Sequence, residues 1–285
     1  MPPFSSEPIC NKGAADCDTR RVIRAWYTRL HFPTEFDAEF EHALSTYAVP
    51  ADATVERYDI KEEDGKKNLL HFLYFCEETK RRYTALGLPE EVLLATLADI
   101  VTYTKHWSGI KGTLVLFELP WLVRHLTARI FRLGRLQFCA GKSECDIPAI
   151  GVKKDDPILE VHIPEGEKLS TEACLAAFDE ARAFFAKYYP DFTYACFTCH
   201  SWLLDETLRK YLSEGSNILR FGDLFTRLFA DKSDALLHYI FRWDTTEKNL
   251  SAFTPTNAFA ARIKAAVEAG EEFHETYGYV ATKPQ

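Results

Sequence analysis

The chain has 285 residues, of which 47% are apolar and 14% aromatic, enough to bury one large core or two ordinary ones. Its formal net charge of -8 argues against a surface that binds the phosphates of nucleic acids. The first residues lack a signal-peptide core, and no run of about 18 apolar residues is present to span a bilayer. We therefore expect a cytoplasmic protein with neither a nucleic-acid nor a membrane partner.

The N-terminal half has the residue spacing of helices. Residues 1–18 are rich in Pro, Ser, Gly and Asp and are expected to be disordered. Beyond them, apolar residues recur at helical spacing and predict long helices over 67–86 and 88–101. Gly87 stands at the C-cap position between these two helices. A further helix is predicted over 116–132.

The period of the apolar pattern changes from 3.6 to 2 at about residue 134. We therefore predict an α+β protein: a helical domain over 19–134, then an α/β domain with a mixed central sheet over 135–285. The strands expected in the second domain are 135–139, 158–163, 194–201, 216–221 and 237–243, and its helices are 170–188, 205–213 and 257–270.

The eight cysteines are too dilute for a disulfide scaffold. Cys196 and Cys199 form a Cys-x-x-Cys pair, but on a strand residues three apart point to opposite faces. Cys10 and Cys17 have no matching ligands near them in the sequence. No metal site is expected from these spacings.

The strand predicted over 158–163 carries two residues suited to acid–base chemistry on one face. Alternation puts Glu160 and His162 on the same side of that strand, while Leu159, Val161 and Ile163 point to the other side. The helix that follows has Ser170 or Thr171 at its start, and the first turn of a helix is a natural anion site. A structural role for each polar residue is the alternative.

The strand predicted over 194–201 brings a second histidine. Thr198 and His200 share one face, and a crossover through helix 170–188 would place His200 near His162. Ser201, His200 and Asp205 are the residue types of a hydrolytic triad, and Cys199 is a possible nucleophile. Neighbouring residues of a strand point apart, however, so hydrolysis is the weaker interpretation.

Four arginines cluster where the two predicted domains meet. Arg129, Arg132 and Arg135 recur every three residues after Arg124 and are suited to hold a phosphate or a carboxylate. Salt bridges across the junction are the alternative use of these charges.

Five ordered motifs resemble a bacterial family that joins a helical acyltransferase N-terminal domain to a GNAT-like C-terminal domain. The resemblance covers about residues 20 to 280. It rests on Gly87-Leu88-Pro89-Glu90-Glu91, Phe131-Arg132-Leu133-Gly134-Arg135-Leu136-Gln137-Phe138, Val161-His162-Ile163-Pro164, Cys199-His200-Ser201-Trp202-Leu203-Leu204-Asp205 and Ser216-Asn217-Ile218-Leu219-Arg220-Phe221.

The resemblance implies an acyl-coenzyme A co-substrate. Strand 158–163, through Val161 and Ile163, would line the thioester arm, and the pyrophosphate would lie at Gly166, Ser170 and Thr171. The loop reads Pro164-Glu165-Gly166-Glu167-Lys168-Leu169 in place of the glycine-rich pattern usual in GNAT proteins, and its two glutamates repel a pyrophosphate.

The same resemblance implies transfer of an acyl group to an amine of a small molecule or peptide. The expected catalytic residues are Glu160, His162 and His200, with Tyr211 as the acid. Substrate contacts are expected from Ser201, Trp202, Asn217, Arg132 and Arg135. A non-catalytic protein that binds an acidic metabolite or peptide is the alternative, and a thioester or amide hydrolase is a weaker one.

Overall fold

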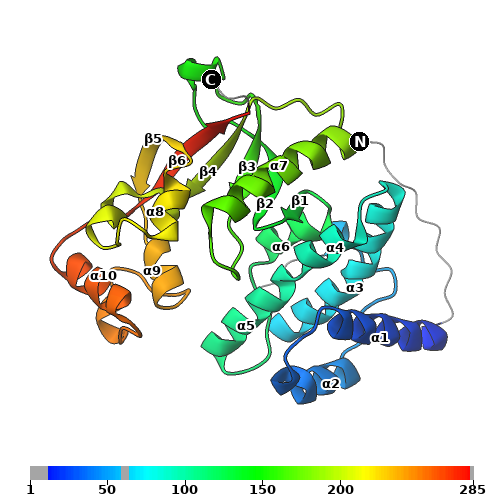
Figure 1. Cartoon of the computed structure of the whole chain (residues 1–285). Helices are drawn as coiled ribbons and strands as arrows, with labels where there is room; N and C mark the ends of the chain where they lie inside the picture. Colours follow the sequence, from blue (N-terminus) through cyan, green and yellow to red (C-terminus); the bar gives the residue numbers. More distant parts are fainter. Residues whose placement is uncertain (1–11, 59–63, 283–285) are drawn as a thin grey trace. The chain divides into compact units, whose positions relative to one another are not determined.

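A computed structural model describes residues 12–58 and 64–282 (Figure 1). The disorder predicted for residues 1–18 falls on 1–11, outside the described residues, and on the start of helix α1 (Lys12–Arg29). Cys10 and Cys17 lie outside the residues whose side chains are described. The chain divides into two compact units, the first ending at Phe131 and the second beginning at Arg132. Within the described ranges, no helix is long and apolar enough to cross a membrane.

The first unit is helical. The predicted helix 67–86 is confirmed as α3 (Gly65–Ala85), whereas the one predicted over 88–101 is divided at Ala98 into α4 (Glu90–Leu97) and α5 (Asp99–Lys111). The helix predicted over 116–132 is too long, because Ala128 has a φ of 53° and the chain then enters a strand. The described elements that follow α1 are η1 (Thr34–Phe36), α2 (Asp37–Thr46), η2 (Val55–Arg57), α3 (Gly65–Ala85), α4 (Glu90–Leu97), α5 (Asp99–Lys111) and α6 (Leu119–Leu126).

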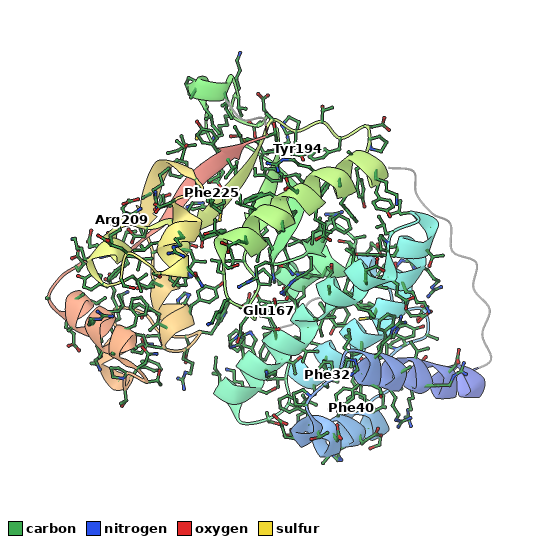
Figure 2. The ribbon with its side chains drawn as sticks, viewed as in Figure 1. Phe32, Phe40, Glu167, Tyr194, Arg209 and Phe225 are labelled. Carbon is green, nitrogen blue, oxygen red and sulfur yellow. The ribbon has the colours of Figure 1, made fainter. Side chains whose placement is uncertain are left out.

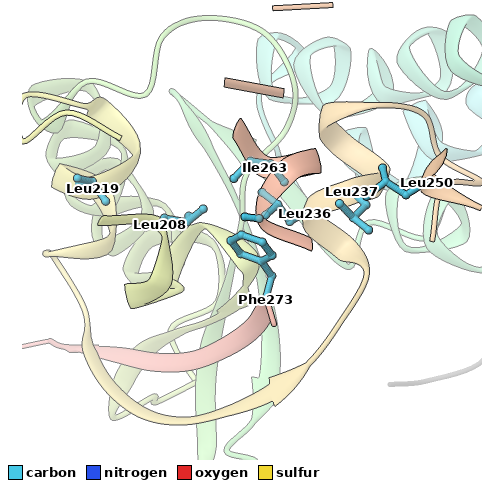
Figure 3. Close-up of a cluster of buried hydrophobic side chains, with 8 residues drawn as sticks. Leu208, Leu219, Leu236, Leu237, Leu250, Ile263 and Phe273 are labelled. Atoms are coloured by element: carbon cyan, nitrogen blue, oxygen red, sulfur yellow. The ribbon is translucent and has the colours of Figure 1, made fainter. Parts of the chain in front are cut away.

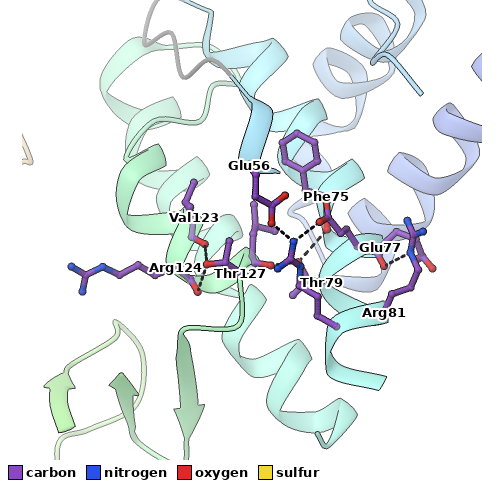
Figure 4. A network of polar contacts seen from close by, with 11 residues as sticks. Glu56, Phe75, Glu77, Thr79, Arg81, Val123, Arg124 and Thr127 are labelled. Atoms are coloured by element: carbon purple, nitrogen blue, oxygen red, sulfur yellow. Dashed lines mark hydrogen bonds and ion pairs between the residues drawn. The ribbon is translucent and has the colours of Figure 1, made fainter. Parts of the chain in front are cut away.

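Aromatic stacking and buried hydrogen bonds hold these helices together. Tyr27 of α1 stacks on Phe32 and Phe40, with ring centroids 4.5 and 3.8 Å away. Figure 2 labels the two phenylalanines. The buried hydroxyl of Thr79 on α3 donates to the carbonyl of Leu126 at the end of α6, at 2.8 Å (Figure 4). This bond satisfies one of the carbonyls that every helix leaves open at its C-terminus.

We expect buried His71 to make the protein less stable in acid. Its Nε2 bonds with the Tyr47 hydroxyl at 2.8 Å, and burial, with a smaller contribution from the charge of Lys67, lowers its pKa to about 4. Between its ordinary pKa and that value the unfolded chain binds a proton that the folded chain does not. The free energy of unfolding therefore falls as the pH falls through this window, by up to about 3 kcal/mol.

Urea unfolding at pH 7 and pH 4.5 measures this effect. His71→Gln keeps a polar partner for Tyr47 but does not titrate, so its loss of stability between the two pH values should be smaller than that of the unmodified chain. Exposed His42 supplies the control, because His42→Gln should keep the full loss. An equal loss in the His71 and His42 variants would refute the assignment.

The second unit is built on a six-stranded sheet of order β1-β2-β3-β4-β6-β5. Strands β3 and β4 are parallel, and the other described pairings, β2 with β3, β4 with β6 and β5 with β6, are antiparallel. The predicted mixed sheet is confirmed. The strands are β1 (Ile130–Leu133), β2 (Leu136–Lys142), β3 (Pro157–His162), β4 (Cys196–Ser201), β5 (Thr226–Lys232) and β6 (His274–Ala281).

Helix α7 (Thr171–Tyr188) is the predicted crossover between the parallel strands β3 and β4 (Figure 1). Its Phe178 is 1% exposed and makes edge-on ring contacts with Phe138 of β2, Phe197 of β4 and Phe225. These residues define the apolar face of the sheet. The predicted strands 135–139, 158–163 and 194–201 are confirmed as β2, β3 and β4 with ends shifted by at most three residues.

Two predicted strands are helices. Residues 217–221 of the predicted strand 216–221 lie in α8 (Asn217–Gly222), and its N-cap Ser216 accepts a capping hydrogen bond from the N–H of Ile218. The predicted strand 237–243 overlaps α9 (Ala235–Ile240). The predicted helix 205–213 is only the short 3-10 turn η5 (Glu206–Lys210). The remaining elements are η3 (Pro148–Ile150), η4 (Trp202–Leu204), η6 (Leu250–Ala252) and α10 (Ala258–Glu268), the last of which confirms the helix predicted over 257–270.

A separate apolar cluster joins α9, α10 and η5 (Figure 3). Its centre includes Leu208, Leu236, Ile263 and Phe273. Buried side chains from segments this short stabilise the unit only jointly, because none of the helices is long enough to be stable alone.

Candidate active site

The face of the sheet opposite Phe178 carries the polar residues. In the register of the strands, Glu160 of β3 lies beside Cys139 of β2 and Thr198 of β4, and His200 of β4 lies beside Tyr277 of β6. Residues directly opposite one another in a sheet point to the same side. The predictions that β3 and β4 are neighbours, and that their polar residues share a face, are therefore confirmed.

The side chains of Cys139, Glu160 and His162 converge on one point. The thiol of Cys139 donates to Glu160 Oε2 at 3.0 Å, and His162 Nε2 lies 3.3 Å from the same oxygen. The Cys139 Sγ is 3.6 Å from His162 Nε2. Cys139 is 3% exposed, whereas the Glu160 and His162 side chains are 33% and 30% exposed. The Glu160 and His162 side chains are thus partly exposed to solvent, and the buried Cys139 thiol contacts both of them.

Gly141 of β2 makes room for the Glu160 carboxylate. A Cβ at this position would lie 2.2 Å from Glu160 Oε1, far inside contact distance. Only a glycine lets the carboxylate lie across this strand and still reach Cys139 and His162 with its other oxygen. The position therefore requires the absence of a side chain rather than an unusual backbone conformation.

Gly141→Ala should displace the Glu160 carboxylate and lower the free energy of unfolding by about 1 kcal/mol, because contacts are lost and the strand is overpacked. Gly109 in α5 is the matched control, since a Cβ there meets nothing within 4 Å and alanine favours the helix. Urea unfolding of both variants measures the contrast. If both changes stabilise the protein equally, the carboxylate is not held where the structure places it.

His200 is held by a different set of groups. Its Nδ1 lies 3.3 Å from Glu144 Oε1, and its ring packs edge-on against Tyr277 and Phe229. The backbone N–H of Glu144 in turn donates to the Tyr277 hydroxyl at 3.3 Å. The Glu144 carboxylate and the two aromatic rings together fix the orientation of the imidazole.

The two parallel strands stop pairing before they end. The register between β3 and β4 covers only Leu159 with Phe197 and Glu160 with Thr198. The carbonyl of Pro157 accepts a hydrogen bond from the N–H of Ala195, so odd-numbered residues of β3 turn their backbone groups toward β4. Alternation therefore places the carbonyl of Val161 at the opening between the strands.

A buried arginine shapes the loop after β3. Arg135 donates from Nε to the carbonyl of Glu167 at 2.7 Å and from Nη1 to that of Pro164 at 2.8 Å. Burial, with the charge of Arg132, lowers the pKa of its guanidinium. Gly166 has a φ of 136°, which glycine tolerates best, and a Cβ there would lie 3.8 Å from an Arg132 Nη. The guanidinium groups of Arg132 and Arg135 thus both lie at the loop that carries Glu165 and Glu167.

The loop leads into the start of α7. Ser170 is the N-cap, and its Oγ accepts from the N–H of Ala173 at 3.2 Å, while Thr171 is the first helical residue. The predicted cap is confirmed. The first turn of an 18-residue helix presents N–H groups and a partial positive charge to an anion.

Other residues predicted for the site have partners elsewhere. Tyr211 packs on Phe273, and its hydroxyl donates to Glu271 Oε2 at 2.9 Å. Burial, reinforced by this bond, raises the pKa of Tyr211. Trp202 packs against the cluster of Figure 3 and its ring lies beside Tyr239. Asn217 is the first residue of α8.

The residues of the predicted hydrolytic triad do not form one. Ser201 Oγ accepts from the N–H of Leu203, and the Asp205 carboxylate accepts from the backbone N–H groups of Thr207 and His274. By strand alternation, Ser201 and Cys199 point to the face opposite His200. Burial also raises the pKa of the Cys199 thiol, so that it stays protonated.

Cys139, Glu144 and Tyr277 were missed in the sequence. Cys139 was placed on a strand, but its role depends on the register with β3, and Tyr277 belongs to a strand that was not predicted. Glu144 follows β2 in the loop to β3. The sequence pattern that could have indicated Cys139 is the alternation in β2. Gln137, Cys139 and Gly141 lie on one face of the strand, whereas Phe138 and Ala140 lie on the other face, which packs against α7.

Comparison with known proteins agrees with this architecture. Residues 130–280 match the GNAT-like C-terminal domain, and residues 9–128 match the N-acyltransferase N-terminal domain. The chain therefore belongs to the family defined by this GNAT-like C-terminal domain, which it joins to an N-acyltransferase N-terminal domain. The family assignment made from the motifs is confirmed. The comparison with curated proteins gave no significant match.

Solved acyltransferase structures share the fold. The crystal structure of an acyltransferase in complex with decanoyl-CoA and teicoplanin has a TM-score of 0.75 at 23% identity, covering 92% of this chain and 88% of that one. An acyltransferase mutant in complex with octanoyl-CoA has a TM-score of 0.76 at 23% identity, covering 91% and 87%. A complex with CoA and 10C-teicoplanin has a TM-score of 0.75 at 22% identity, covering 92% and 88%.

Proposed function

We propose that this protein is an N-acyltransferase that moves an acyl group from acyl-CoA to an amine. The observation that carries the proposal is the opening between β3 and β4 in a GNAT-like domain, with Glu160 and His162 at its edge. An extended thioester arm needs backbone partners in such an opening, and acyl transfer to an amine needs a base beside it.

The donor would lie along β3 and reach the start of α7. The carbonyls of Val161 and Ile163 are suited to accept from the amide groups of the CoA arm. Gly166, Ser170 and Thr171 would face the pyrophosphate, where the first turn of α7 favours an anion. Arg132 beside Gly166 supports this placement, because its charge offsets the glutamates of the loop.

The reaction needs one base and releases one thiol. The amine nitrogen attacks the thioester carbonyl carbon, a C–N bond forms and the C–S bond breaks. Glu160, directly or with His162, accepts the proton that the nitrogen loses, and the CoA thiolate takes up a proton as it leaves. His200 would orient the amine. Tyr277 adjoins His200 and is a second candidate for the acid beside Tyr211.

The acceptor is proposed to be a small molecule or a peptide that carries an amine. Acyltransferases of the same fold have been solved with decanoyl-CoA, octanoyl-CoA and the glycopeptide teicoplanin. This favours medium-chain acyl groups and an acceptor of more than minimal size. Ser201, Trp202, Asn217 and Arg135 remain proposed substrate contacts, of which Arg135 would act by holding the loop.

The test combines donor binding with turnover. Thermal unfolding is recorded with acetyl-, octanoyl- and decanoyl-CoA, since a ligand at 100 times its Kd stabilises by about 2.7 kcal/mol. Release of free CoA thiol is then followed with a panel of amines and peptides. Stabilisation by a medium-chain thioester and amine-dependent thiol release are expected. Absence of stabilisation by any thioester would contradict the proposal.

A further inference from the structure

The cluster formed by Cys139, Glu160 and His162 has the dimensions of a metal site. One ligand atom from each residue lies within 4.8 Å of the others, and the measured separations are 3.0, 3.3 and 3.6 Å. A tetrahedral Zn²⁺ with ordinary Zn–S, Zn–N and Zn–O bonds holds such atoms about 3.3–3.6 Å apart. Two of the three edges therefore already fit, and the third needs about half an ångström of movement.

The geometry points to a site for a zinc-class divalent cation with these three residues as its ligands. Thiolate, imidazole and carboxylate are the donors that zinc selects. Cys139 lies directly opposite Glu160 in the antiparallel register, and His162 follows two residues later on the same strand. The ligands thus come from two paired strands, whose rigidity suits a preformed site.

A nucleophilic triad explains the same three residues less well. In a triad the carboxylate binds one ring nitrogen of the histidine and the nucleophile binds the other. Here His162 Nε2 faces both Glu160 Oε2 and Cys139 Sγ, and the same oxygen faces both partners. Three atoms that converge on one point are the arrangement of ligands around an ion. A nucleophile, a histidine and a carboxylate that act in series would not converge in this way.

Access to the cluster is one-sided. Cys139 is buried, whereas Glu160 and His162 are about one-third exposed, so an ion would reach the cluster past these two side chains. Because Gly141 has no side chain, the Glu160 carboxylate can lie against β2, where its Oε2 reaches the Cys139 thiol. Binding would release the thiol proton of Cys139, because the thiolate is the ligand.

Metal binding would regulate acyl transfer, and this step rests on the proposed function. The lone pairs of Glu160 and His162 that accept the amine proton are the ones that would coordinate the ion. The metal-bound enzyme therefore lacks its base, and zinc acts as a reversible inhibitor that a chelator removes.

Cobalt binding tests the site without any acyl-CoA. The untagged, chelator-treated protein is titrated with Co²⁺, and the visible bands of a tetrahedral ion and the thiolate-to-cobalt charge-transfer band are recorded. One equivalent should bind with both signals. Cys139→Ser should abolish the charge-transfer band and weaken binding at least about 100-fold, since even residues that only orient ligands contribute 10–100-fold.

Cys145→Ser is the matched control, because Cys145 is a more accessible cysteine flanked by two acidic residues. It should keep both signals, and His162→Gln should lose affinity as Cys139→Ser does. The site is overturned if the charge-transfer band is missing from the unmodified chain, or if Cys145→Ser and not Cys139→Ser removes it.

Inhibition is tested separately, with the metal-free rate of each variant as its own reference. Zn²⁺ should inhibit the unmodified chain, and Cys139→Ser should need at least about 100-fold more zinc for the same fractional inhibition. Cobalt binding without any acyl transfer would refute the proposed function alone. Acyl transfer without cobalt binding would refute the metal site alone.

Discussion

Replacing Glu160 by Gln should lower kcat for acyl transfer by about 100- to 10,000-fold, the usual contribution of a general base. The substitution keeps the size of the side chain and the room provided by Gly141, so the fold should persist. Rates with saturating octanoyl-CoA and amine measure the effect.

Two comparisons make this result specific. Glu268→Gln removes an exposed carboxylate of α10, which pairs with Lys264, and should leave kcat unchanged. Cobalt binding should fall in the Glu160 variant and not in the Glu268 variant. An unaltered kcat in Glu160→Gln would remove this carboxylate from the mechanism and leave His162 or His200 as the base.

Phe178→Ala should lower the free energy of unfolding by about 3–5 kcal/mol, the range seen when a buried aromatic ring is deleted. The ring is almost fully buried and touches Phe138, Phe197 and Phe225, so its loss opens a cavity between α7 and the sheet. Because the same helix follows the proposed pyrophosphate loop, affinity for acyl-CoA should fall with stability. Urea unfolding and donor titration on one preparation measure both.

Leu175 on the same helix supplies the control. Its side chain is 48% exposed, so Leu175→Ala should change the free energy of unfolding by less than about 0.5 kcal/mol. Equal effects at the two positions would mean that α7 packs on the sheet differently from the contacts described.

The parts of the fold that were predictable are those whose signal is local. Helix α3 and strand β3 were found because a single apolar period extends over the whole element. Helix α8 was mistaken for a strand because its buried residues Leu219 and Phe221 are two apart, and six residues are too few to display a helical period. Strand β5 lies at the sheet edge, where partial exposure removes the alternation that would have marked it.

The residues of the candidate site were also predictable only where their sequence signal is local. Glu160 and His162 were predicted together because one strand carries both. Cys139 and Tyr277 reach the same face only through pairing with other strands, and no local pattern encodes that register. The use of Arg135 to hold the 164–167 loop was also missed, since its partners are backbone carbonyls, which have no sequence signature.

The alternation in β3 limits how this protein can diversify. Leu159 and Val161 are buried, and Glu160 and His162, which alternate with them along the strand, face the site. Deleting or inserting one residue in this strand would turn the carboxylate and imidazole into the apolar core and expose the aliphatic side chains. Evolution of a new acceptor preference is therefore expected to proceed by point substitutions within the strands and by length changes in the loops, such as 143–156.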